Sequence, residues 1–243
     1  MEKLNDQSMK TVLVTGGARR VGKIFALACA RAGADVVIHH GHSEEEAQKV
    51  REEVTGLGRR AWVFEADFND PSQAESLIPR INESTPLHGL VNSAAIFGAL
   101  SLENTSIEDW QKHLTINLTA PFLLSRAFAR QAPDGGQIVN ILDWRALRPG
   151  ADHFPYTISK AALAALTKSL AVALAPKIIV NGLALGAILP PSDGKATPNI
   201  TKNIPAGRWA EEHEVEQALL FFLTCPTYVT GEIMYLDGGR HLV

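Results

Sequence analysis

The sequence predicts an α/β protein of one domain, built on a doubly wound sheet of parallel strands. Short runs of apolar and β-branched residues alternate along the chain with longer segments of helical periodicity, which is the pattern of repeated strand and helix units. A chain of 243 residues is long enough to bury one such core, and no repeat or linker divides it. We expect residues 9–243 to form the domain and residues 1–8 to be a disordered tail.

Apolar runs bounded by turn residues predict the strands, and the periodic segments between them predict the helices. The expected strands lie at residues 11–15, 35–40, 61–66, 88–91, 135–142, 178–181 and 233–236. The expected helices lie at about 23–32, at 43–57, after Pro71, from about 107, from Tyr156 to Ala175, and near 211–224. Gly33 ends the first helix, and Ser43 opens the second, where the acidic run at residues 44–46 suits the N-terminal dipole.

Composition excludes several classes of function. The net charge of −3 gives no reason to expect nucleic acid as a partner. Cys29 and Cys225 lie far apart, with neither metal-binding nor disulfide spacing, which favours a reducing, cytoplasmic compartment. No run approaches the roughly 20 apolar residues that a membrane span needs, and the first apolar cluster is too short for a signal peptide. His39, His40 and His42 alternate at a strand end without a further ligand, so no metal site is expected.

The first strand leads into a turn that is suited to hold a phosphate. This turn carries Gly16, Gly17 and Gly22, and a helix follows it directly. Glycines let the backbone approach a pyrophosphate, and a helix N-terminus supplies N–H groups and a positive dipole. The glycine spacing is not the usual G-x-G-x-x-G, but the order of strand, turn and helix supports a dinucleotide cofactor.

The end of the second strand indicates which cofactor is used. An enzyme that prefers the non-phosphorylated cofactor usually carries an acid about 20 residues beyond the glycine turn, bonded to the ribose 2′-OH. Here no acid precedes Glu44, whereas Arg20 and the hydroxyl of Ser43 could bind a 2′-phosphate. We therefore predict NADPH rather than NADH. The alternative is that Arg20 is only a solvated cation at the start of a helix.

Polar and small residues follow the next two strands at their carboxyl ends. Asp67 lies where it could accept from an adenine amine, and its alternative role is to cap the helix after Pro71. The small residues from Asn92 onward allow a cofactor to lie close to the strand end. Phe97 just beyond them could equally belong to the core. Asn117 falls inside the next helical pattern, where a buried amide needs hydrogen-bond partners.

The chemistry is expected where the fifth strand ends and the next helix begins. Asp143 ends that strand, and ligands bind at this end of an open parallel sheet. Tyr156 and Lys160 are four residues apart, so their side chains share one helical face. A tyrosine has a reference pKa of about 10, and an ammonium one turn away stabilises its phenolate and lowers that pKa.

Two further segments predict a partner and a lid. The helix from Tyr156 to Ala175 is apolar on nearly every side, so we infer that it forms a subunit interface. Residues 190–203 are rich in polar residues and proline with little to bury, and they follow a strand end, which favours a substrate lid.

Five motifs in the same order make the chain resemble the short-chain dehydrogenase/reductase family along nearly its whole length. They are Thr15-Gly16…Gly22, Asp67, Asn92, Asn117 and Tyr156-x-x-x-Lys160. The resemblance implies a Rossmann fold of about seven strands, an NAD(P)(H)-dependent reaction at Tyr156, and a homotetramer or homodimer. It also implies that Lys160 holds the nicotinamide ribose and that Asn117 supports a water beside Lys160. The chain departs from the family at Ser93-Ala94-Ala95, where Asn-Ala-Gly is usual, and at Leu185-Gly186, where Pro-Gly is usual.

The resemblance assigns residues to three roles. The expected catalytic residues are Asp143, Tyr156, Lys160 and Asn117. The expected cofactor contacts are Gly16, Arg19, Arg20, Val21, His40, His42, Ser43, Asp67, Phe68, Asn92, Ala94, Tyr156, Lys160, Gly186 and Ile188. The expected substrate contacts are Phe97, Asp143, Tyr156 and Leu189.

Asp143 is the informative departure, because most of the family has a serine thirteen residues before the tyrosine. A serine donates a hydrogen bond to a substrate carbonyl, whereas an ionised aspartate cannot. A carboxylate beside Tyr156 also opposes the phenolate, offsets Lys160 and keeps the tyrosine protonated. This favours reduction of a substrate that offers N–H donors or takes a proton on nitrogen. The alternative is a protonated Asp143 that mimics serine.

A closer resemblance is to the pteridine reductase and dihydromonapterin reductase branch of this family. It rests on the glycine turn with Arg20, on His42-Ser43, on Phe97, on the Asp143/Tyr156/Lys160 set, and on the ending Leu236-Asp237-Gly238-Gly239-Arg240-His241-Leu242. In that branch the arginine marks NADPH use and the phenylalanine stacks the pterin. The branch often has arginine at His42 and serine at Ala95. The resemblance implies hydride transfer from NADPH to a C=N bond of a dihydropterin, with the proton from Tyr156 relayed through Lys160 and Asp143.

Two other functions fit the same motifs. A short-chain carbonyl reductase that acts on 3-oxoacyl thioesters or a small ketone is common in this family. The non-enzymatic alternative is a protein that binds NADPH as a sensor and catalyses no reaction. The presence of Asn117, Tyr156 and Lys160 argues against it.

Overall fold

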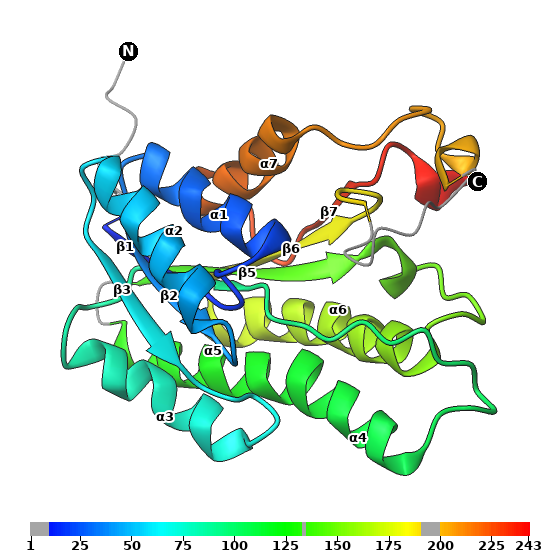
Figure 1. Cartoon of the computed structure of the whole chain (residues 1–243), viewed down its shortest axis with the longest axis horizontal. Helices are drawn as coiled ribbons and strands as arrows, with labels where there is room; N and C mark the ends of the chain where they lie inside the picture. Colours follow the sequence, from blue (N-terminus) through cyan, green and yellow to red (C-terminus); the bar gives the residue numbers. More distant parts are fainter. Residues whose placement is uncertain (1–9, 133–134, 191–199) are drawn as a thin grey trace.

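The protein forms one seven-stranded parallel sheet with helices on both faces (Figure 1). The computed structural model describes residues 10–132, 135–190 and 200–243. The strand order is β3-β2-β1-β4-β5-β6-β7, and every neighbouring pair is parallel. The strands are β1 Thr11–Val14, β2 Asp35–His40, β3 Ala61–Glu65, β4 Gly89–Asn92, β5 Gly136–Asp143, β6 Ile178–Leu185 and β7 Ile233–Leu236. The predicted doubly wound α/β fold of one domain is confirmed.

Seven α-helices connect these strands in the part of the chain that the structure describes. They are α1 Arg20–Arg31, α2 Glu44–Gly56, α3 Pro71–Asn82, α4 Ile107–Leu114, α5 Ala120–Gln131, α6 Phe154–Leu174 and α7 Glu212–Thr224. Local chemistry sets several of their ends. Asp70 caps α3 by accepting from the backbone N–H of Ser72, and Pro71 occupies the first helical position. Ser106 caps α4 in the same way, through the N–H of Asp109.

The helix predicted from about residue 107 is interrupted. A π-helical turn, η1 Thr115–Thr119, separates α4 from α5. Pro121, which lacks a donor N–H, falls at the start of α5, where no intrahelical donor is needed. The π turn brings Asn117 into the interior, where its side chain is fully buried. Such turns are frequent at functional sites.

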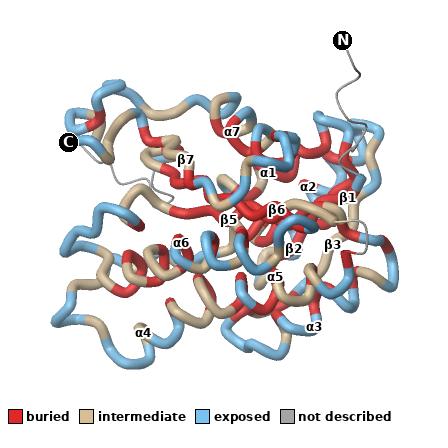
Figure 2. Tube along the Cα trace, turned by 180° about the vertical axis from the view of Figure 1, so that it is seen from behind, coloured by how far each residue is buried: buried red, intermediate tan, exposed pale blue. Residues whose placement is uncertain are grey.

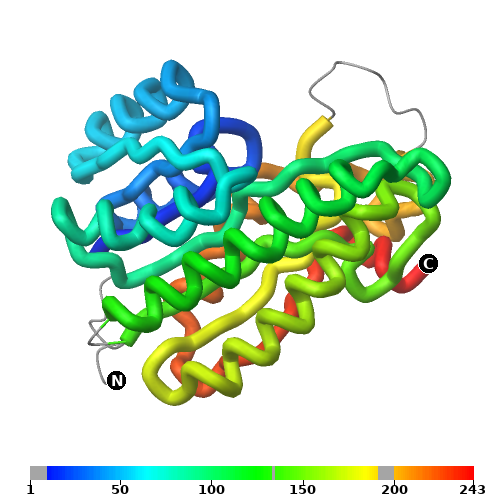
Figure 3. The backbone as a smooth tube through the Cα atoms, turned by 90° about the horizontal axis from the view of Figure 1, so that it is seen from below, coloured from blue at the N-terminus to red at the C-terminus, as the bar shows by residue number. Residues whose placement is uncertain are grey.

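Each face of the sheet buries its own hydrophobic layer. Val12 and Val14 of β1 belong to the core under α1, α2 and α7, whereas Leu13 between them belongs to the core under α3 and α5. This alternation follows from the two-residue period of a strand. Figure 2 shows the buried strands between the exposed outer surfaces of the helices, and Figure 3 shows α3, α5 and α6 side by side below the sheet.

The helix α6 is a core helix along one side. By length and composition alone it could cross a membrane, so the expectation that no segment is long enough is wrong for this helix. Its packing gives a different reason for its apolar sequence, because one side, including Tyr156, Lys160 and Leu163, is buried against the sheet. Its outer side carries exposed residues such as Lys168 and Val172, the latter 84% exposed.

The candidate site lies at the point where the strand order of the sheet reverses. β1 pairs with β2 on one side and with β4 on the other, so the loops after β1 and β4 diverge and leave a crevice at their carboxyl ends. The glycine turn and the segment after Asn92 meet there. The predicted tail at residues 1–8 and residues 191–199 of the predicted lid lie outside the described residues, whereas the end of the lid forms the short 3₁₀ helix η3 Ile200–Asn203.

Candidate active site

The glycine turn after β1 is fixed by close backbone contacts. Gly16 has a φ of +64°, and a Cβ added to it would lie 3.0 Å from the Cα of Ala94. A Cβ at Gly22 would lie 2.0 Å from the carbonyl oxygen of Gly16. Ala94 in turn donates its N–H to the hydroxyl of Thr15. Only glycine fits these two positions, so the turn can bring backbone N–H groups close to a ligand.

We predict that Gly22→Ala lowers the free energy of unfolding by about 2 kcal/mol, because the new methyl group forces the turn away from Gly16. Thermal unfolding, followed by circular dichroism, measures the change. Gly56→Ala is the matched control, since a Cβ there meets nothing within 4 Å and the position is helical. Equal stability of the two variants would show that the turn adapts to a side chain.

His39 holds this turn in place, a role that the sequence did not predict. Its Nδ1 accepts from the N–H of Gly16 at 3.1 Å, and its Nε2 donates to the carbonyl of Ala66 at 2.9 Å. Burial lowers the pKa of His39 to about 4, so the ring is neutral and its proton sits on Nε2. The ring also stacks on Phe68 at 4.1 Å. The available signal was its place at the end of the strand beside the glycine turn.

The N-terminus of α1 has the features of an anion site. Arg19 at its N-cap position makes no capping hydrogen bond with its side chain, and no acidic residue lies in the first turn. The first N–H groups of a helix lack intrahelical partners and carry the positive end of its dipole. The absence of a side-chain cap leaves these groups for a ligand, which fits the predicted pyrophosphate site.

The two arginines of the turn point in different directions. The Arg20 guanidinium donates to the carbonyl of Pro190 at 2.8 Å, beyond the end of β6. Arg19 instead pairs with Glu46 of α2, next to the turn that follows β2. The backbone causes this divergence, since Arg19 is extended and Arg20 has a φ of +49°. Arg19 is therefore the arginine that lies against the start of α2, and the contact of Arg20 with a cofactor stays a prediction.

The turn between β2 and α2 divides its histidines between two roles. His40 is buried, where its ring accepts from the N–H of Ser43 and lies 2.7 Å from the Glu44 carboxylate. It therefore stabilises the turn, and a contact between His40 and a cofactor stays a prediction. His42 is exposed and lies 3.6 Å from the Asp67 carboxylate. Since Asp70 caps α3, Asp67 does not have the capping role that was its alternative.

Four other predicted cofactor contacts are closely packed within the protein. The amide of Asn92 donates to Asn140 at 2.8 Å in a buried pair, and Phe68 packs on His39. Ile188 belongs to the hydrophobic core. A Cβ at Gly186 would lie 2.6 Å from the Cα of Asp237, so close packing already requires this glycine. Contacts of these four residues with a cofactor stay predictions.

Three of the predicted catalytic side chains, Asp143, Tyr156 and Lys160, lie together at the end of β5. The Tyr156 hydroxyl donates to Oδ2 of Asp143 at 3.2 Å, and the Lys160 ammonium donates to the carbonyl of Ile141 at 2.6 Å. The ammonium lies 5.9 Å from the centre of the Tyr156 ring. Thus the helix and the strand bring all three predicted side chains together, but the hydroxyl bonds to the carboxylate and not to the ammonium.

Burial and charge hold Tyr156 in its protonated form. Burial raises the pKa of Tyr156 well above 10, and the charge of Asp143 and its hydrogen bond raise it further. The expected lowering by Lys160 is therefore wrong, because spacing on a helix does not reveal burial. Burial also lowers the pKa of Lys160 to about 8, although the charge of Asp143 opposes this. The expected effect of Asp143 on Tyr156 agrees with the structure.

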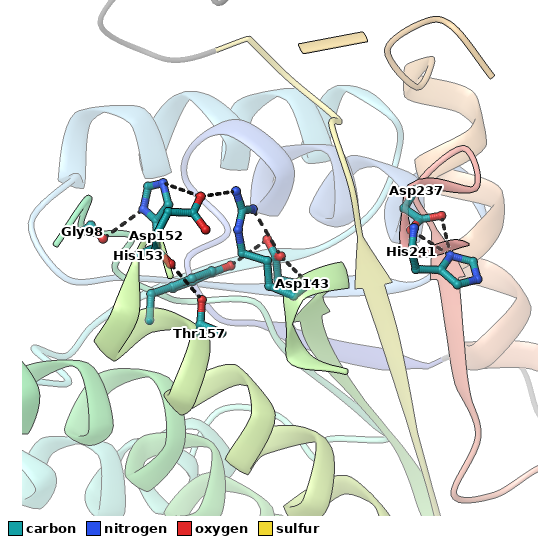
Figure 4. A network of polar contacts seen from close by, with 9 residues as sticks. Gly98, Asp143, Asp152, His153, Thr157, Asp237 and His241 are labelled. Carbon is teal, nitrogen blue, oxygen red and sulfur yellow. Dashed lines mark hydrogen bonds and ion pairs between the residues drawn. The ribbon is translucent and has the colours of Figure 1, made fainter. Parts of the chain in front are cut away.

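Arg145 anchors the Asp143 carboxylate and was not predicted. Its backbone N–H donates to Oδ1 of Asp143 at 2.9 Å, and its guanidinium lies 3.6 Å from the same oxygen. The guanidinium also binds Asp152 at 2.9 Å, so one partly buried cation joins two carboxylates (Figure 4). Each described partner of Asp143 is a hydrogen-bond donor, which fits an ionised carboxylate better than the protonated alternative. The signal was a cation two residues after the strand-end aspartate.

Phe97 lies beside the ring of Tyr156, and its side chain is 57% exposed. It stacks on His153 with 4.0 Å between ring centres and meets the Tyr156 ring edge-on at 4.7 Å. His153 donates to the carbonyl of Gly98 at 3.0 Å, and Figure 4 shows this pair beside Asp152. The alternative that Phe97 is a core residue is wrong, because more than half of its surface remains available.

Asn117 ties the loop after β4 to α6. Its Oδ1 accepts from the N–H of Ile96 at 2.9 Å, and its Nδ2 donates to Ser159 at 3.0 Å. Ser159 in turn donates to the carbonyl of Tyr156 at 2.7 Å. These bonds satisfy the buried amide and fix the first turn of α6. Support of a water beside Lys160 stays a prediction.

Known reductases and dehydrogenases are similar to this chain over nearly its full length. The family described as enoyl-(acyl carrier protein) reductase matches residues 16–241. FolM alternative dihydrofolate reductase 1 from Brucella canis, complexed with NADP, has a TM-score of 0.90 at 31% identity, covering 97% of this chain and 95% of that chain.

Two curated relatives are similarly close. 2-Dehydro-3-deoxy-D-gluconate 5-dehydrogenase from Bacillus subtilis is 34% identical over 241 residues, covering 95% of this chain and 94% of its own length. 3-Oxoacyl-[acyl-carrier-protein] reductase FabG from Aggregatibacter actinomycetemcomitans is 33% identical, covering 95% of this chain and 98% of its own length. With the glycine turn and the Tyr156–Lys160 pair in place, the chain belongs to the short-chain dehydrogenase/reductase family.

Proposed function

We propose that this protein is an NADPH-dependent reductase that delivers a hydride to a C=N bond of a dihydropterin. The observation that carries the proposal is the hydrogen bond from Tyr156 to Asp143. A carboxylate at this place can accept N–H groups of a substrate, whereas the usual serine would donate to a carbonyl. The exposed ring of Phe97 beside Tyr156 offers a face on which a flat heterocycle can stack. The Brucella canis relative, a FolM alternative dihydrofolate reductase, is consistent with this substrate class.

The residues present fit the cofactor. Gly16 and Gly22 leave no room for a side chain at their own positions, and the uncapped N-terminus of α1 offers N–H groups to the pyrophosphate. Arg19, His42 and Ser43 would hold the 2′-phosphate, and the Brucella canis relative is complexed with NADP. When bound, NADPH supplies the hydride.

The proton comes from the side chains at the end of β5. Tyr156 stays protonated, so it can give its proton to the substrate nitrogen as the hydride arrives at carbon. The phenolate that results lies beside the Asp143 carboxylate, and this repulsion favours rapid return of a proton. Lys160 lies one helical turn away and opposes the negative charge while it is itself protonated. Asp143 orients the hydroxyl, and Arg145 holds Asp143 in place.

The cofactor assignment predicts different effects for the two arginines of the turn. Arg19→Gln is expected to raise the Kd of NADPH about tenfold and to leave the Kd of NADH unchanged, because the lost charge-assisted bond serves only the 2′-phosphate. Arg20→Gln should not discriminate between the cofactors, since its guanidinium bonds to the Pro190 carbonyl. Fluorescence titration measures both constants. Loss of discrimination with Arg20→Gln alone would return the 2′-phosphate role to Arg20.

The pH dependence of reduction follows from Lys160. Its pKa of about 8 is depressed from 10.5, so its positive charge is fully present at acidic and neutral pH and is lost as the pH rises through about 8. Tyr156 remains protonated over this range because its pKa lies higher. We predict that kcat/KM for reduction is constant at neutral pH and falls above about pH 8. A profile measured from pH 6 to 9.5 that rises through pH 8 would contradict this role of Lys160.

The substrate class is tested by NADPH oxidation with purified protein. Dihydrobiopterin and dihydromonapterin are compared with acetoacetyl-CoA at saturating NADPH, and absorbance at the nicotinamide band gives the rate. Turnover confined to the pterins supports the proposal. Turnover of the thioester alone would overturn it and would favour a 3-oxoacyl reductase, the second candidate, which the similarity to FabG from Aggregatibacter actinomycetemcomitans supports. Binding of NADPH without turnover of either class would favour a cofactor sensor.

The predicted homo-oligomer remains a proposal based on α6. Its outer side presents Ala165, Ala173 and the exposed Val172, which suit close approach of a second helix. Sedimentation velocity of the purified chain distinguishes monomer, dimer and tetramer.

A further inference from the structure

A cavity of about 700 Å³ lies beside the reacting centre, against the turn that follows Asp143. Its walls combine positive charge with apolar surface. The side chains that matter here are Trp144, Arg148, Lys202, Ile204, Pro205 and Arg240. Among the described residues, three of the lining side chains are cationic and none is acidic. An apolar floor with several cationic side chains is suited to a ligand that ends in a negative charge.

The cations of this cavity are held in place by specific contacts. The Arg240 guanidinium lies over the indole of Trp144, 4.5 Å from the ring centre, and the Arg145 guanidinium lies 4.8 Å from the same ring. Arg148 donates to the backbone carbonyl of Arg240 at 3.1 Å. The arginines therefore converge through a cation–π contact and a hydrogen bond, and need not be ordered by the ligand itself.

The cations that line the cavity differ in how they meet neighbouring acids. Arg240 lies within range of the charges of three carboxylates, which are Asp143, Asp152 and Asp237. Arg145 is paired with Asp143 and Asp152, so its charge is already compensated. Among the described residues, Arg148, Lys202 and Arg240 take part in no ion pair. Arginine binds carboxylates and phosphates with two parallel hydrogen bonds, and lysine adds a point charge. Among the described residues, Arg148 and Lys202 therefore carry the part of the positive charge that no acid compensates, and Arg240 adds a partly compensated charge.

The cavity is connected to the proton donor through a short series of contacts. The Tyr156 hydroxyl bonds to Asp143, the Asp143 carboxylate faces Arg145, and Arg145 lies over Trp144 on the cavity wall. A substrate whose reducible bond lies at Tyr156 can thus extend over the indole and place its far end among the cations. The apolar wall formed by Trp144, Ile204 and Pro205 would cover the connecting part of such a molecule.

We propose that this cavity binds an anionic group, a carboxylate or a phosphate, at the end of the substrate that is remote from the reduced bond. That the anion belongs to the substrate rests on the proposed reductase function. The existence of an anion site does not, because it depends only on the three cations and the cavity. The site selects among dihydropterins by the charge of their side chain.

The anion site is tested first by binding alone. Isothermal titration with inorganic pyrophosphate and with γ-glutamylglutamate is done at saturating NADP⁺, so that the phosphate sites of the cofactor are filled. We expect saturable binding, weakened about tenfold by Arg148→Gln and by Lys202→Gln. Arg130→Gln, which removes an exposed arginine of α5, is the matched control and should bind like the native protein. The tighter of the two probes identifies a phosphate or a carboxylate ligand. Equal affinity in all variants, or no saturable binding, would overturn the proposal.

Whether the anion site binds part of the substrate is tested by comparing the KM values of a charged and an uncharged dihydropterin. Dihydrofolate carries a glutamate tail, whereas dihydrobiopterin is uncharged. We expect Arg148→Gln to raise the KM of dihydrofolate about tenfold more than that of dihydrobiopterin. Equal effects on both would overturn the assignment to substrate. If neither pterin is reduced while the anion probes still bind and still respond to Arg148→Gln, the proposed function fails and the anion site stands.

Discussion

Replacing Tyr156 with phenylalanine is expected to lower kcat for dihydropterin reduction by about 1,000-fold, the range of a positioned general acid. The change removes only the hydroxyl that bonds to Asp143 and leaves the ring against Phe97. The Kd of NADPH should change little, since the glycine turn and the β2–α2 turn are untouched. Steady-state rates and a fluorescence titration of NADPH separate the two effects.

Tyr228→Phe is the matched control for this prediction. Tyr228 is 99% exposed, so loss of its hydroxyl should alter neither kcat nor stability. Stability should also be nearly retained in Tyr156→Phe, because Asp143 keeps its bond from the Arg145 backbone and its ion pair with that guanidinium. A variant at position 156 that keeps a tenth of the native kcat would show that the proton comes from another group.

The reacting groups could be predicted because each lies at a place that local sequence defines. Asp143 ends an apolar run that can only be a buried strand, and Tyr156 and Lys160 are separated by one helical turn. Parallel pairing then brings the strand end and the helix start to one edge of the sheet. The fold followed from the same alternation of strands and helices. These predictions depend only on the periodicity of the strands and helices, and they do not require the contacts of any side chain to be known.

The direction of the pKa shift of Tyr156 could not be predicted in the same way. Spacing places Lys160 on the same helical face, but it does not show that both side chains are buried. Desolvation disfavours the charged form of each group, and it is the largest cause of both pKa shifts. The ammonium bonds to the Ile141 carbonyl on β5, a partner that depends on how α6 packs on the sheet.

The phosphate-binding side chains show a second limit. Arg19 and Arg20 are adjacent and chemically identical, so the sequence offers no way to choose between them. The left-handed backbone of Arg20 turns its side chain toward Pro190 and leaves Arg19 beside α2. His39 and Arg145 were missed for a related reason. Both act by holding another residue in place, and such a role appears only when the backbone positions are known.

Replacing Asp143 with serine is expected to lower kcat/KM for dihydropterins about 100-fold and to raise activity on acetoacetyl-CoA. The serine restores a donor for a carbonyl and removes the acceptor for substrate N–H groups. It also removes the negative charge that raises the pKa of Tyr156 and of Lys160. Both pKa values should therefore fall, and the decrease of the rate that the native protein shows above about pH 8 should move to lower pH. Steady-state rates on both substrates and a pH profile measure these effects.

Asp152→Ser distinguishes the chemistry of Asp143 from the general loss of a carboxylate. Asp152 binds the same Arg145 guanidinium at 2.9 Å but makes no described contact with Tyr156. Asp152→Ser should leave the preference for pterin over thioester unaltered. The pH at which the rate of reduction begins to fall should also stay the same. If Asp143→Ser and Asp152→Ser behave alike, the carboxylates matter only through Arg145, and the case for a pterin substrate is lost. If only Asp143→Ser exchanges one substrate for the other, a single side chain at the end of β5 decides which bond this fold reduces.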